Sequence, residues 1–442
     1  MNILILTNTY IPHVGGVARS VAAFSEEYRA RGHEVLIVAP EFPDMPENER
    51  GVIRVHAIQN FNASDFSVVL PTMLSLDERI DAFDPDLVHS QHPFLLGTSA
   101  VRIARRLGVP LVFTHHTRYE RYTHYVPGDS PALKRFVIEL ATRYANLCDL
   151  VFAPSESVRQ LLEHRGVTAP IKVVPTGVRP ELFARGDGAG FRSQTGIPDD
   201  AFVVGHLGRL APEKNLEFLA ESVAGFAADD SRVHFLVVGN GPSEDAIRAT
   251  FARAGLEQRL HHVGVLQQQA LSDALHAMDL FAFASTSETQ GMVLTEAMAA
   301  ALPVVALEAP GASEVVTDRH NGRLLPDADP HTFAGALAWV AGLPDSELSA
   351  MRKAALATAE RFSMTRSADK ALDCFAALQS GSPAAATQDE SAWEELLKAI
   401  KAEWNLLQNI AGASDAALNG RSPAGEVAEG GIPYVPSSGR GR

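Results

Sequence analysis

The chain alternates short, strongly apolar runs with longer amphipathic stretches, and it does so in two separate series. The first series comprises residues 3–6, 34–39, 86–89, 111–114 and 150–153. The second comprises residues 202–206, 234–238, 261–263, 280–284 and 303–306. Apolar runs of this length between helix-length segments are typical of βαβ units, which build a parallel sheet covered by helices on both faces. The sequence therefore predicts an α/β protein with two doubly wound, Rossmann-like domains.

The length of 442 residues, 46% of them hydrophobic, is enough to give both domains a core. A glycine-rich polar stretch at 184–190 predicts a boundary near residues 180 to 198. We expect a first domain over 1–182 and a second over 199–364. Ligands of open parallel sheets bind beyond the carboxyl ends of the strands, so two such edges facing each other predict a cleft between the domains.

The last segment, 379–442, differs in composition from both domains. After a linker, apolar residues from Trp393 to Ile410 recur at helical spacing, which predicts an amphipathic helix over 392–410. Glycine, serine, alanine and proline dominate beyond it, which predicts a disordered tail. The helix carries charges of both signs, so contact with a membrane, with the protein body or with a second copy all remain open. The oligomeric state is not predicted.

Composition disfavours several classes of function. The net charge of −15 argues against general binding of nucleic acid, whose phosphates would be repelled. No apolar run reaches the roughly 18 residues of a membrane span, and the N-terminal run is too short for a signal peptide. We therefore expect a cytoplasmic protein.

Two carboxylates eight positions apart, Glu288 and Glu296, flank the junction between the run at 280–284 and a following helix. A helix that begins near Gly291 points unpaired amides outward, which with the helix dipole makes a site for a diphosphate. Glu288 then lies beside the group attached to the phosphate, and Glu296 lies where it can accept hydrogen bonds from ribose hydroxyls. The alternative is a helix start that is simply rich in acidic residues.

In each predicted domain, a further candidate segment follows the first strand. Arg209 and Lys214 come after the run at 202–206, where two cations can hold a diphosphate and neutralise it as it departs. Gly15 and Gly16 come after the run at 3–6, where glycine lets the backbone approach a phosphate closely. Solvated surface cations and a tight turn are the respective alternatives. The glycine pair is not a full G-x-G-x-x-G motif, which disfavours an NAD-binding domain.

Together with Gly239-Asn240-Gly241-Pro242, these motifs resemble the retaining GT-B glycosyltransferases of family 4, over residues 1 to about 378. The resemblance implies that the first domain is the acceptor side and the second binds a nucleotide sugar. It implies that Glu296 holds the ribose and Glu288 faces the donor sugar. It also implies a return helix over 365–378 that crosses back to the first domain. The other donor-binding residues that it implies are Gly15, Gly16, Arg209, Lys214, Gly239, Leu266, Gly291, Met292, Val293 and Leu294.

A narrower pattern, His-Thr-x-Tyr-Glu-x-Tyr-x-His-Tyr, occupies residues 116–125 and is similar to the subgroup that glucosylates diacylglycerol. The resemblance places His116 by the reaction centre, so the catalytic candidates are His116, Glu288, Arg209 and Lys214. Tyr119, His124 and Tyr125 are acceptor-side candidates. His115 is an additional candidate, and a structural histidine in a packed loop is the alternative.

The resemblance implies transfer of a hexose from a nucleotide diphosphate sugar, with UDP-glucose favoured, to a lipid acceptor such as diacylglycerol. Retention of configuration is expected, with no cofactor and no metal, since Asp327-Ala328-Asp329 lacks nearby partners. The same fold also serves transferases that use GDP-mannose or a soluble acceptor, sugar-nucleotide epimerases and binding modules, and these alternatives stay open.

A lipid acceptor requires contact with a membrane surface. Basic residues gather on and near a predicted helix around 131–147 that also carries apolar side chains, and they are Arg118, Arg121, Lys134, Arg135 and Arg143. Such a helix can lie at an anionic interface, which would make the protein peripheral on the inner face of the membrane. An ordinary amphipathic surface helix is the alternative.

Overall fold

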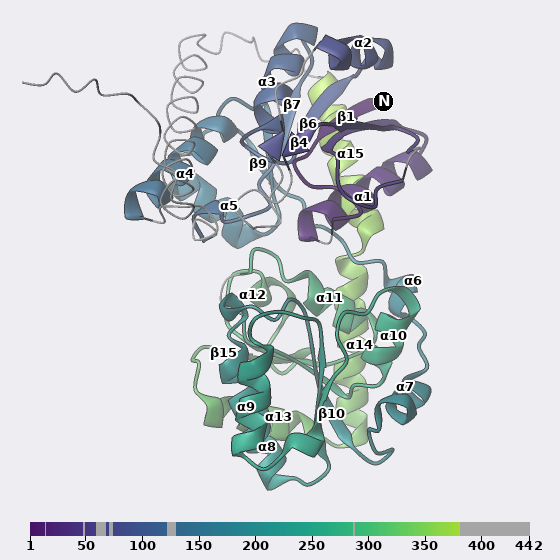
Figure 1. The fold of residues 1–442 in the computed structure, drawn as a ribbon, viewed down its shortest axis with the longest axis vertical. Coiled ribbons are helices and arrows are strands. Elements are labelled where there is room, and N and C mark those ends of the chain that lie inside the picture. Colours follow the sequence, from purple (N-terminus) through teal and green to yellow (C-terminus); the bar gives the residue numbers. More distant parts are fainter. Residues whose placement is uncertain are drawn as a thin grey trace, which may run out of the picture.

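The computed structural model describes residues 1–13, 15–46, 49–58, 68–69, 74–121, 130–285 and 288–380. Within these ranges the chain forms two α/β domains, which lie one above the other in Figure 1 and confirm the predicted architecture. Residues 379–380 end the last described helix. The rest of the predicted C-terminal segment, including the helix over 392–410, lies outside the described residues.

The first domain has a seven-stranded parallel sheet with the order β3-β2-β1-β6-β7-β8-β9. The strands are β1 (Asn2–Leu6), β2 (Glu34–Pro40), β3 (Val52–Val55), β6 (Leu87–Ser90), β7 (Leu111–Thr114), β8 (Leu150–Ala153) and β9 (Ile171–Val173). The short strands β4 (Ala57–Ile58) and β5 (Val68–Val69) pair separately and antiparallel.

Helices cover both faces of this sheet. The buried residues of α1 (Gly16–Ala30) and of the final helix α15 (Met364–Ser380) pack on one face. Those of α2 (Leu74–Phe83), α3 (Leu96–Leu107), α4 (Pro131–Ala145) and α5 (Glu156–His164) pack on the other. A short 3-10 helix, η2 (Tyr119–Arg121), follows β7.

The second domain has a six-stranded parallel sheet with the order β12-β11-β10-β13-β14-β15. The strands are β10 (Phe202–Leu207), β11 (Val233–Val238), β12 (Leu260–His262), β13 (Leu280–Phe283), β14 (Val304–Leu307) and β15 (Gly322–Leu325). One face carries α8 (Leu216–Asp229), α9 (Glu244–Arg253) and α13 (Pro330–Ala341). The other carries α6 (Pro180–Phe183), α7 (Gly188–Thr195), α10 (Gln268–His276), α11 (Met292–Ala299), α12 (Ala312–Val315) and α14 (Asp345–Arg361).

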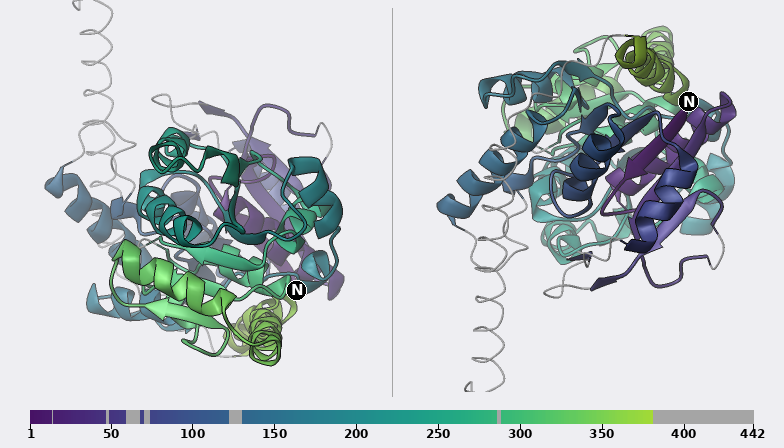
Figure 2. Two further views of the ribbon diagram at one scale, coloured as in Figure 1. Left: turned by 90° about the horizontal axis from the view of Figure 1, so that it is seen from below. Right: turned by 90° about the horizontal axis from the view of Figure 1, so that it is seen from above.

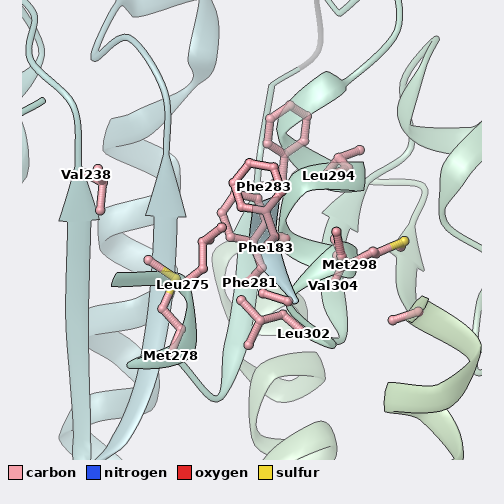
Figure 3. Close-up of a cluster of buried hydrophobic side chains, with 14 of the residues drawn as sticks. Phe183, Val238, Leu275, Met278, Phe281, Phe283, Leu294, Met298, Leu302 and Val304 are labelled. Carbon is pink, nitrogen blue, oxygen red and sulfur yellow. The ribbon is translucent and has the colours of Figure 1, made fainter. Parts of the chain in front are cut away.

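The core beneath α11 is built from long apolar side chains. Figure 3 shows Leu294 and Met298 of α11 beside Phe281 and Phe283 of β13, and all four are buried. A fully buried Phe or Leu stabilises the fold by roughly 1.5–3 kcal/mol relative to an exposed one. This packing fixes α11 on one face of the sheet, with its first residue following the carboxyl end of β13, where the candidate site lies.

The stretch at 180–198, where the sequence predicts a boundary, contains α6 and α7. Phe183 and Phe191 from these helices pack on the core of the second domain. The glycines at 188 and 190 lie in α7, which Asp187 caps by accepting a hydrogen bond from the Gly190 amide at 2.8 Å. A polar, glycine-rich composition therefore corresponds here to a short capped helix and not to an open linker.

The chain crosses between the domains at 174–178 and again at 362–364. Val174 belongs to the first core and Val178 to the second. The two crossings pair with each other, since the Val178 amide donates to the Phe362 carbonyl at 2.9 Å and the Met364 amide to the Val178 carbonyl at 2.6 Å. A Cβ on Gly177 would lie 2.3 Å from Met364 Cα, so this close pairing requires glycine.

Beyond the second crossing, α15 runs into the first domain (Figures 1 and 2). Its Phe375 is fully buried and stacks on Phe152 of β8, with ring centroids 5.7 Å apart. The last described helix thus belongs to the first core. In the part of the chain that the structure describes, no helix is long and apolar enough to span a bilayer.

Candidate active site

In both sheets the strand order reverses beside the first strand, between β1 and β6 and between β10 and β13. The carboxyl ends of strands at such a switch point are the usual ligand position in open α/β sheets. Lys214 follows β10 at the end of a 3-10 helix, η4 (Pro212–Lys214), and Glu288 follows β13. The two side chains meet there, since Lys214 Nζ donates a hydrogen bond to Glu288 Oε1.

This ion pair is partly shielded from water, with Lys214 22% and Glu288 16% exposed. Arg209, the other predicted cation, is paired with Glu213 four residues later and is 48% exposed. Both cations therefore already have a carboxylate partner, and an incoming diphosphate would compete with Glu288 and Glu213 for them.

The helix α11 starts one residue after Gly291, close to the predicted position. Gly291 is the N-cap with φ +75° and ψ +48°, a left-handed conformation that favours glycine. The first amides of any helix lack an intrahelical acceptor, which leaves those of Met292 and Val293 as donors. The Leu294 amide differs, because it donates to the Gly291 carbonyl at 3.0 Å.

Glu296 is buried in α11 and reaches a residue of the other domain. Its Oε1 lies 3.2 Å from Nη2 of Arg19, which is on α1. Its Oε2 is buried without a hydrogen-bond partner in the described part of the chain. Burial raises the pKa of the Glu296 carboxyl, and the Arg19 guanidinium opposes this shift without cancelling it.

The glycines of the site are of two kinds. Among the described residues, a Cβ on Gly16, at the start of α1, would meet no atom within 4 Å, so the backbone here borders open space. A Cβ on Gly239 would lie 1.8 Å from the Gly208 carbonyl oxygen, so Gly239 allows two loops of the second domain to touch. Gly15 is the N-cap of α1, and a Cβ there would lie 3.2 Å from the His13 ring.

Leu266 follows β12, where the resemblance places the base of the donor. Its side chain is half-buried and packs against the core under α11. The preceding loop is tied to the site, since the Gly239 amide donates to the Gly264 carbonyl at 2.7 Å.

His116 follows β7 in the first domain and lies against the second. Its carbonyl accepts a hydrogen bond from the Thr289 hydroxyl at 3.1 Å, and its Nε2 lies 2.7 Å from Gln91 Oε1. With that amide oxygen as acceptor, Nε2 carries the proton and Nδ1 is left as an acceptor. Burial lowers the pKa of His116 well below its usual range, and the nearby His92, His89 and His115 lower it further.

His115 points into the core instead. Its ring lies edge-on to Phe113 and Tyr119, at centroid distances of 5.8 and 5.3 Å, and is 1% exposed. The structure thus distinguishes the two adjacent histidines, since His116 contacts Thr289 of the second domain and His115 packs internally.

Of the acceptor-side candidates, His124 and Tyr125 lie outside the described residues. Tyr119 is in η2, and its ring also packs edge-on against Phe94 at 5.5 Å. The next residue, Glu120, is held by Arg165, the C-cap residue of α5, at 2.7 Å and by Arg118 at 3.2 Å. This network anchors the start of the loop that the narrower pattern singles out.

The predicted basic group divides into two sets. Arg118 is 19% exposed and bound to Glu120, so it stabilises the loop rather than facing outward. Lys134, Arg135 and Arg143 are exposed on α4. Arg121 is the last residue of η2, and its side chain is not among those described.

Asp329, in the weak Asp327-Ala328-Asp329 motif, caps α13, where its carboxylate accepts a hydrogen bond from the Thr332 amide at 2.7 Å. The Asp329 carboxylate is thus bound to the first turn of a helix. Among the residues placed by the structure, no three His, Cys, Asp or Glu side chains are grouped as metal ligands.

Sequence reasoning missed three residues near the site, of which Arg19 and Gln290 make contacts beyond their own domain. Arg19 lies three positions after Gly16, hence on the same face of α1, and this spacing was an available signal. Gln91 follows β6, and Gln290 precedes α11. A polar side chain after the carboxyl end of a strand is a weak indication alone, and only the fold shows that Gln91 contacts His116 and that Gln290 binds the backbone of Thr176.

The fold defines a two-domain α/β protein, and a known domain family matches each domain. The description "Glycosyltransferase Family 4" matches residues 14–182, and "Glycosyl transferases group 1" matches residues 189–357. The chain belongs to glycosyltransferase family 4, and it is a glycosyltransferase.

Two relatives illustrate the range of the family. The chain is similar to an alpha-monoglucosyldiacylglycerol synthase of Streptococcus pneumoniae, with 29% identity covering 76% of this chain and 77% of the relative. It is also similar to a GDP-mannose-dependent alpha-mannosyltransferase of Mycobacterium tuberculosis, with 30% identity covering 74% and 84%.

Solved structures share the fold. A crystal structure of HepE from Anabaena in complex with UDP aligns with a TM-score of 0.68 and 23% identity, covering 86% of this chain and all of that one. Sucrose-phosphate synthase from Thermosynechococcus elongatus aligns with the same TM-score, 18% identity and coverage of 86% and 99%.

Proposed function

We propose that the protein transfers a hexose from a nucleotide diphosphate sugar, with UDP-glucose favoured, to a lipid acceptor such as diacylglycerol. The observation that carries this proposal is the Lys214–Glu288 pair at the switch point of the second sheet, one residue from the Thr289 contact to His116. The positive charge of Lys214, which can neutralise a leaving diphosphate, therefore lies close to His116 of the acceptor-side domain.

In this proposal the second domain binds the donor. Lys214 and Arg209 neutralise the diphosphate, and the amides of Met292 and Val293 donate to its oxygens. Glu296 accepts hydrogen bonds from the ribose, for which its unpartnered Oε2 is the available atom. Gly16 borders open space from the first domain and lets the backbone approach the same phosphates.

Transfer is proposed to retain configuration. Nucleotide-activated glucose is α-linked, and the relatives named above are alpha-glycosyl enzymes by name. The acceptor hydroxyl attacks the anomeric carbon on the face that the diphosphate leaves. The bond from that carbon to the phosphate oxygen breaks, and the departing diphosphate takes the hydroxyl proton. His116, kept neutral by its lowered pKa, lies by the sugar and can accept a hydrogen bond through Nδ1.

The lipid acceptor is supported by two relatives named alpha-monoglucosyldiacylglycerol synthase, from Streptococcus pneumoniae and Acholeplasma laidlawii. The exposed Lys134 and Arg135 on α4 supply positive charge for an anionic membrane, at roughly 1 kcal/mol for each cation near the surface. Arg143 is exposed on the same helix but is ion-paired with Glu139 at 2.7 Å. We propose a cytoplasmic protein that is peripheral on the inner face of the membrane.

A second candidate is transfer of mannose from GDP-mannose. It is favoured by the mannosyltransferases of Mycobacterium tuberculosis and Mycolicibacterium smegmatis, at 30% and 32% identity. The difference lies in the base and the sugar, and the proposed diphosphate contacts serve both donors equally.

An acceptor screen tests the proposal. Radiolabelled UDP-glucose and GDP-mannose are each supplied with and without diacylglycerol in anionic vesicles. The expected result is a labelled lipid from UDP-glucose and release of UDP only when diacylglycerol is present. Conversion of the donor without any acceptor indicates an epimerase or hydrolase instead and contradicts transfer.

Removal of divalent metal is expected to leave activity unchanged within about twofold. Arg209, Lys214 and the N-terminus of α11 supply the positive charge that a metal provides in other enzymes. The measurement is the initial rate after dialysis against EDTA, compared with the rate after magnesium is added back. A tenfold loss that magnesium restores contradicts this part of the proposal.

Glu296→Gln is expected to weaken UDP binding about tenfold or more, because hydrogen bonds to a charged acceptor are worth about 1.5–3 kcal/mol. The same variant is expected to raise the Tm of the protein without nucleotide. The folded-state pKa of Glu296 is raised, so burying the ionised carboxylate costs stability at neutral pH, and the cost disappears below the unfolded value of 4.5.

Calorimetric titration and thermal unfolding at pH 8 and pH 5 measure both effects. The Tm gain of Glu296→Gln is expected to be larger at pH 8 than at pH 5. A lower Tm at both values with unchanged UDP affinity contradicts the role assigned to Glu296.

A further inference from the structure

The side chain of Gln290 joins the donor loop to the first crossing between the domains. The Thr176 amide donates to Gln290 Oε1 at 2.8 Å, and Gln290 Nε2 donates to the Thr176 carbonyl. One side-chain amide thus satisfies both backbone groups of one residue, and only glutamine or asparagine offers a donor and an acceptor in this arrangement. Gln290 is 8% exposed, so water does not readily replace these bonds.

Thr176 lies at the point where the domains are linked. Its hydroxyl is 2.7 Å from the Ser20 hydroxyl on α1 of the first domain. It precedes Gly177 and Val178, through which the two crossings pair. Gln290 is therefore hydrogen-bonded to Thr176, which is itself bonded to Ser20 of α1 and lies next to the paired crossings.

Gln290 also lies in the middle of the segment 288–291, which precedes α11 in the second domain. It stands between Thr289, which donates to the His116 carbonyl, and Gly291, the N-cap of α11. Gln290 thus lies two residues after Glu288 and directly before the N-cap of α11. The residue next to Ser20 on α1 is Arg19, which reaches Glu296, so α1 contacts both Thr176 and the helix α11 that follows Gln290.

We propose that Gln290 is a positioning residue that couples the donor loop to the interdomain crossing and holds the two domains in the arrangement required for transfer. The proposal rests on the proposed function, since it concerns the same donor site. The proposed side-chain contacts to the nucleotide come from Lys214, Arg209 and Glu296 of the second domain and do not involve Gln290. Transfer additionally needs His116 of the first domain. Loss of this amide is therefore expected to lower kcat while nucleotide affinity is kept.

The test uses the full chain with Gln290→Glu, which removes the Nε2 donor and sets a carboxylate oxygen against the Thr176 carbonyl, and Gln290→Met, which removes both bonds at similar volume. Matched controls are Gln258→Glu and Gln258→Met, at an exposed residue of the short 3-10 helix η5 (Glu257–Arg259) in the same domain. Steady-state kinetics, UDP titration, thermal unfolding and small-angle X-ray scattering are measured for each.

Both Gln290 variants are expected to lose at least tenfold in kcat, with the Kd for UDP within about threefold of wild type and with the controls unchanged. Their radius of gyration with UDP is expected to exceed that of wild type. A kcat within twofold of wild type overturns the proposal. Parallel loss of UDP affinity and kcat also overturns it, because that pattern indicates local damage to the donor pocket.

Should the Gln290 variants not fold, Ser20→Ala carries the test, since it removes only the hydroxyl bonded to Thr176. A kcat loss of about threefold at constant UDP affinity is expected, and an unchanged kcat overturns the coupling. A wild-type protein that binds UDP but transfers no hexose contradicts the proposed function. The role of Gln290 in holding the two domains is then tested by small-angle X-ray scattering. Identical scattering profiles of the wild type and the Gln290 variants overturn the proposed role of Gln290.

Discussion

Glu288→Gln is expected to lower kcat by about 100-fold or more, the range seen when a group that stabilises transition-state charge is removed. The substitution keeps the shape of the side chain and a hydrogen-bond acceptor for Lys214 but removes the negative charge proposed to face the donor sugar. UDP affinity is expected to stay within about threefold, since Glu288 is not proposed to hold the nucleotide. Initial rates at saturating donor and a UDP titration measure the two effects.

Glu221→Gln is the matched control, because Glu221 is an exposed carboxylate on α8 of the same domain. It is expected to behave as wild type in both assays. Wild-type turnover by Glu288→Gln would remove Glu288 from the catalytic group.

Lys214→Ala is expected to impair both binding and turnover, with a UDP affinity at least tenfold weaker and a kcat about 100-fold lower. The lysine is proposed to meet the diphosphate in the bound donor and to neutralise it further as it departs, so its loss affects both states. The variant also leaves Glu288 partly buried without its cation, which costs stability.

The double variant Lys214→Ala with Glu288→Gln separates these effects. It is expected to recover Tm but not activity, because it removes the unpaired charge and not the need for a cation. Lys353→Ala, at an exposed lysine of α14, is the control. Recovery of turnover in the double variant contradicts a direct role for Lys214.

The sequence predicted the layered architecture because buried parallel strands leave a direct trace. The run at 111–114 is fully buried and coincides with β7, and the run at 150–153 coincides with β8. The strands that were missed carry little such signal. β3 includes Arg54, and β15 begins with Gly322 followed by Arg323, so each reads as polar or irregular although it completes a sheet edge.

The candidate site was predictable only in part, for a similar reason. A motif after a strand indicates which edge of its own sheet a residue occupies, and this was enough to bring Lys214 and Glu288 together. The partner of Glu296 is Arg19, distant in sequence and on the other domain, and the partner of Gln290 is a backbone segment. Such contacts depend on how two domains dock, which local sequence patterns do not encode.

The most direct test of the central claim is a crystal structure of the protein with UDP-glucose. The account predicts the diphosphate between the domains, against the amides at the start of α11 and close to Gly16, with Lys214 turned from Glu288 to a phosphate oxygen and the ribose on Glu296. A nucleotide bound elsewhere, or one that leaves the Lys214–Glu288 pair intact, contradicts it.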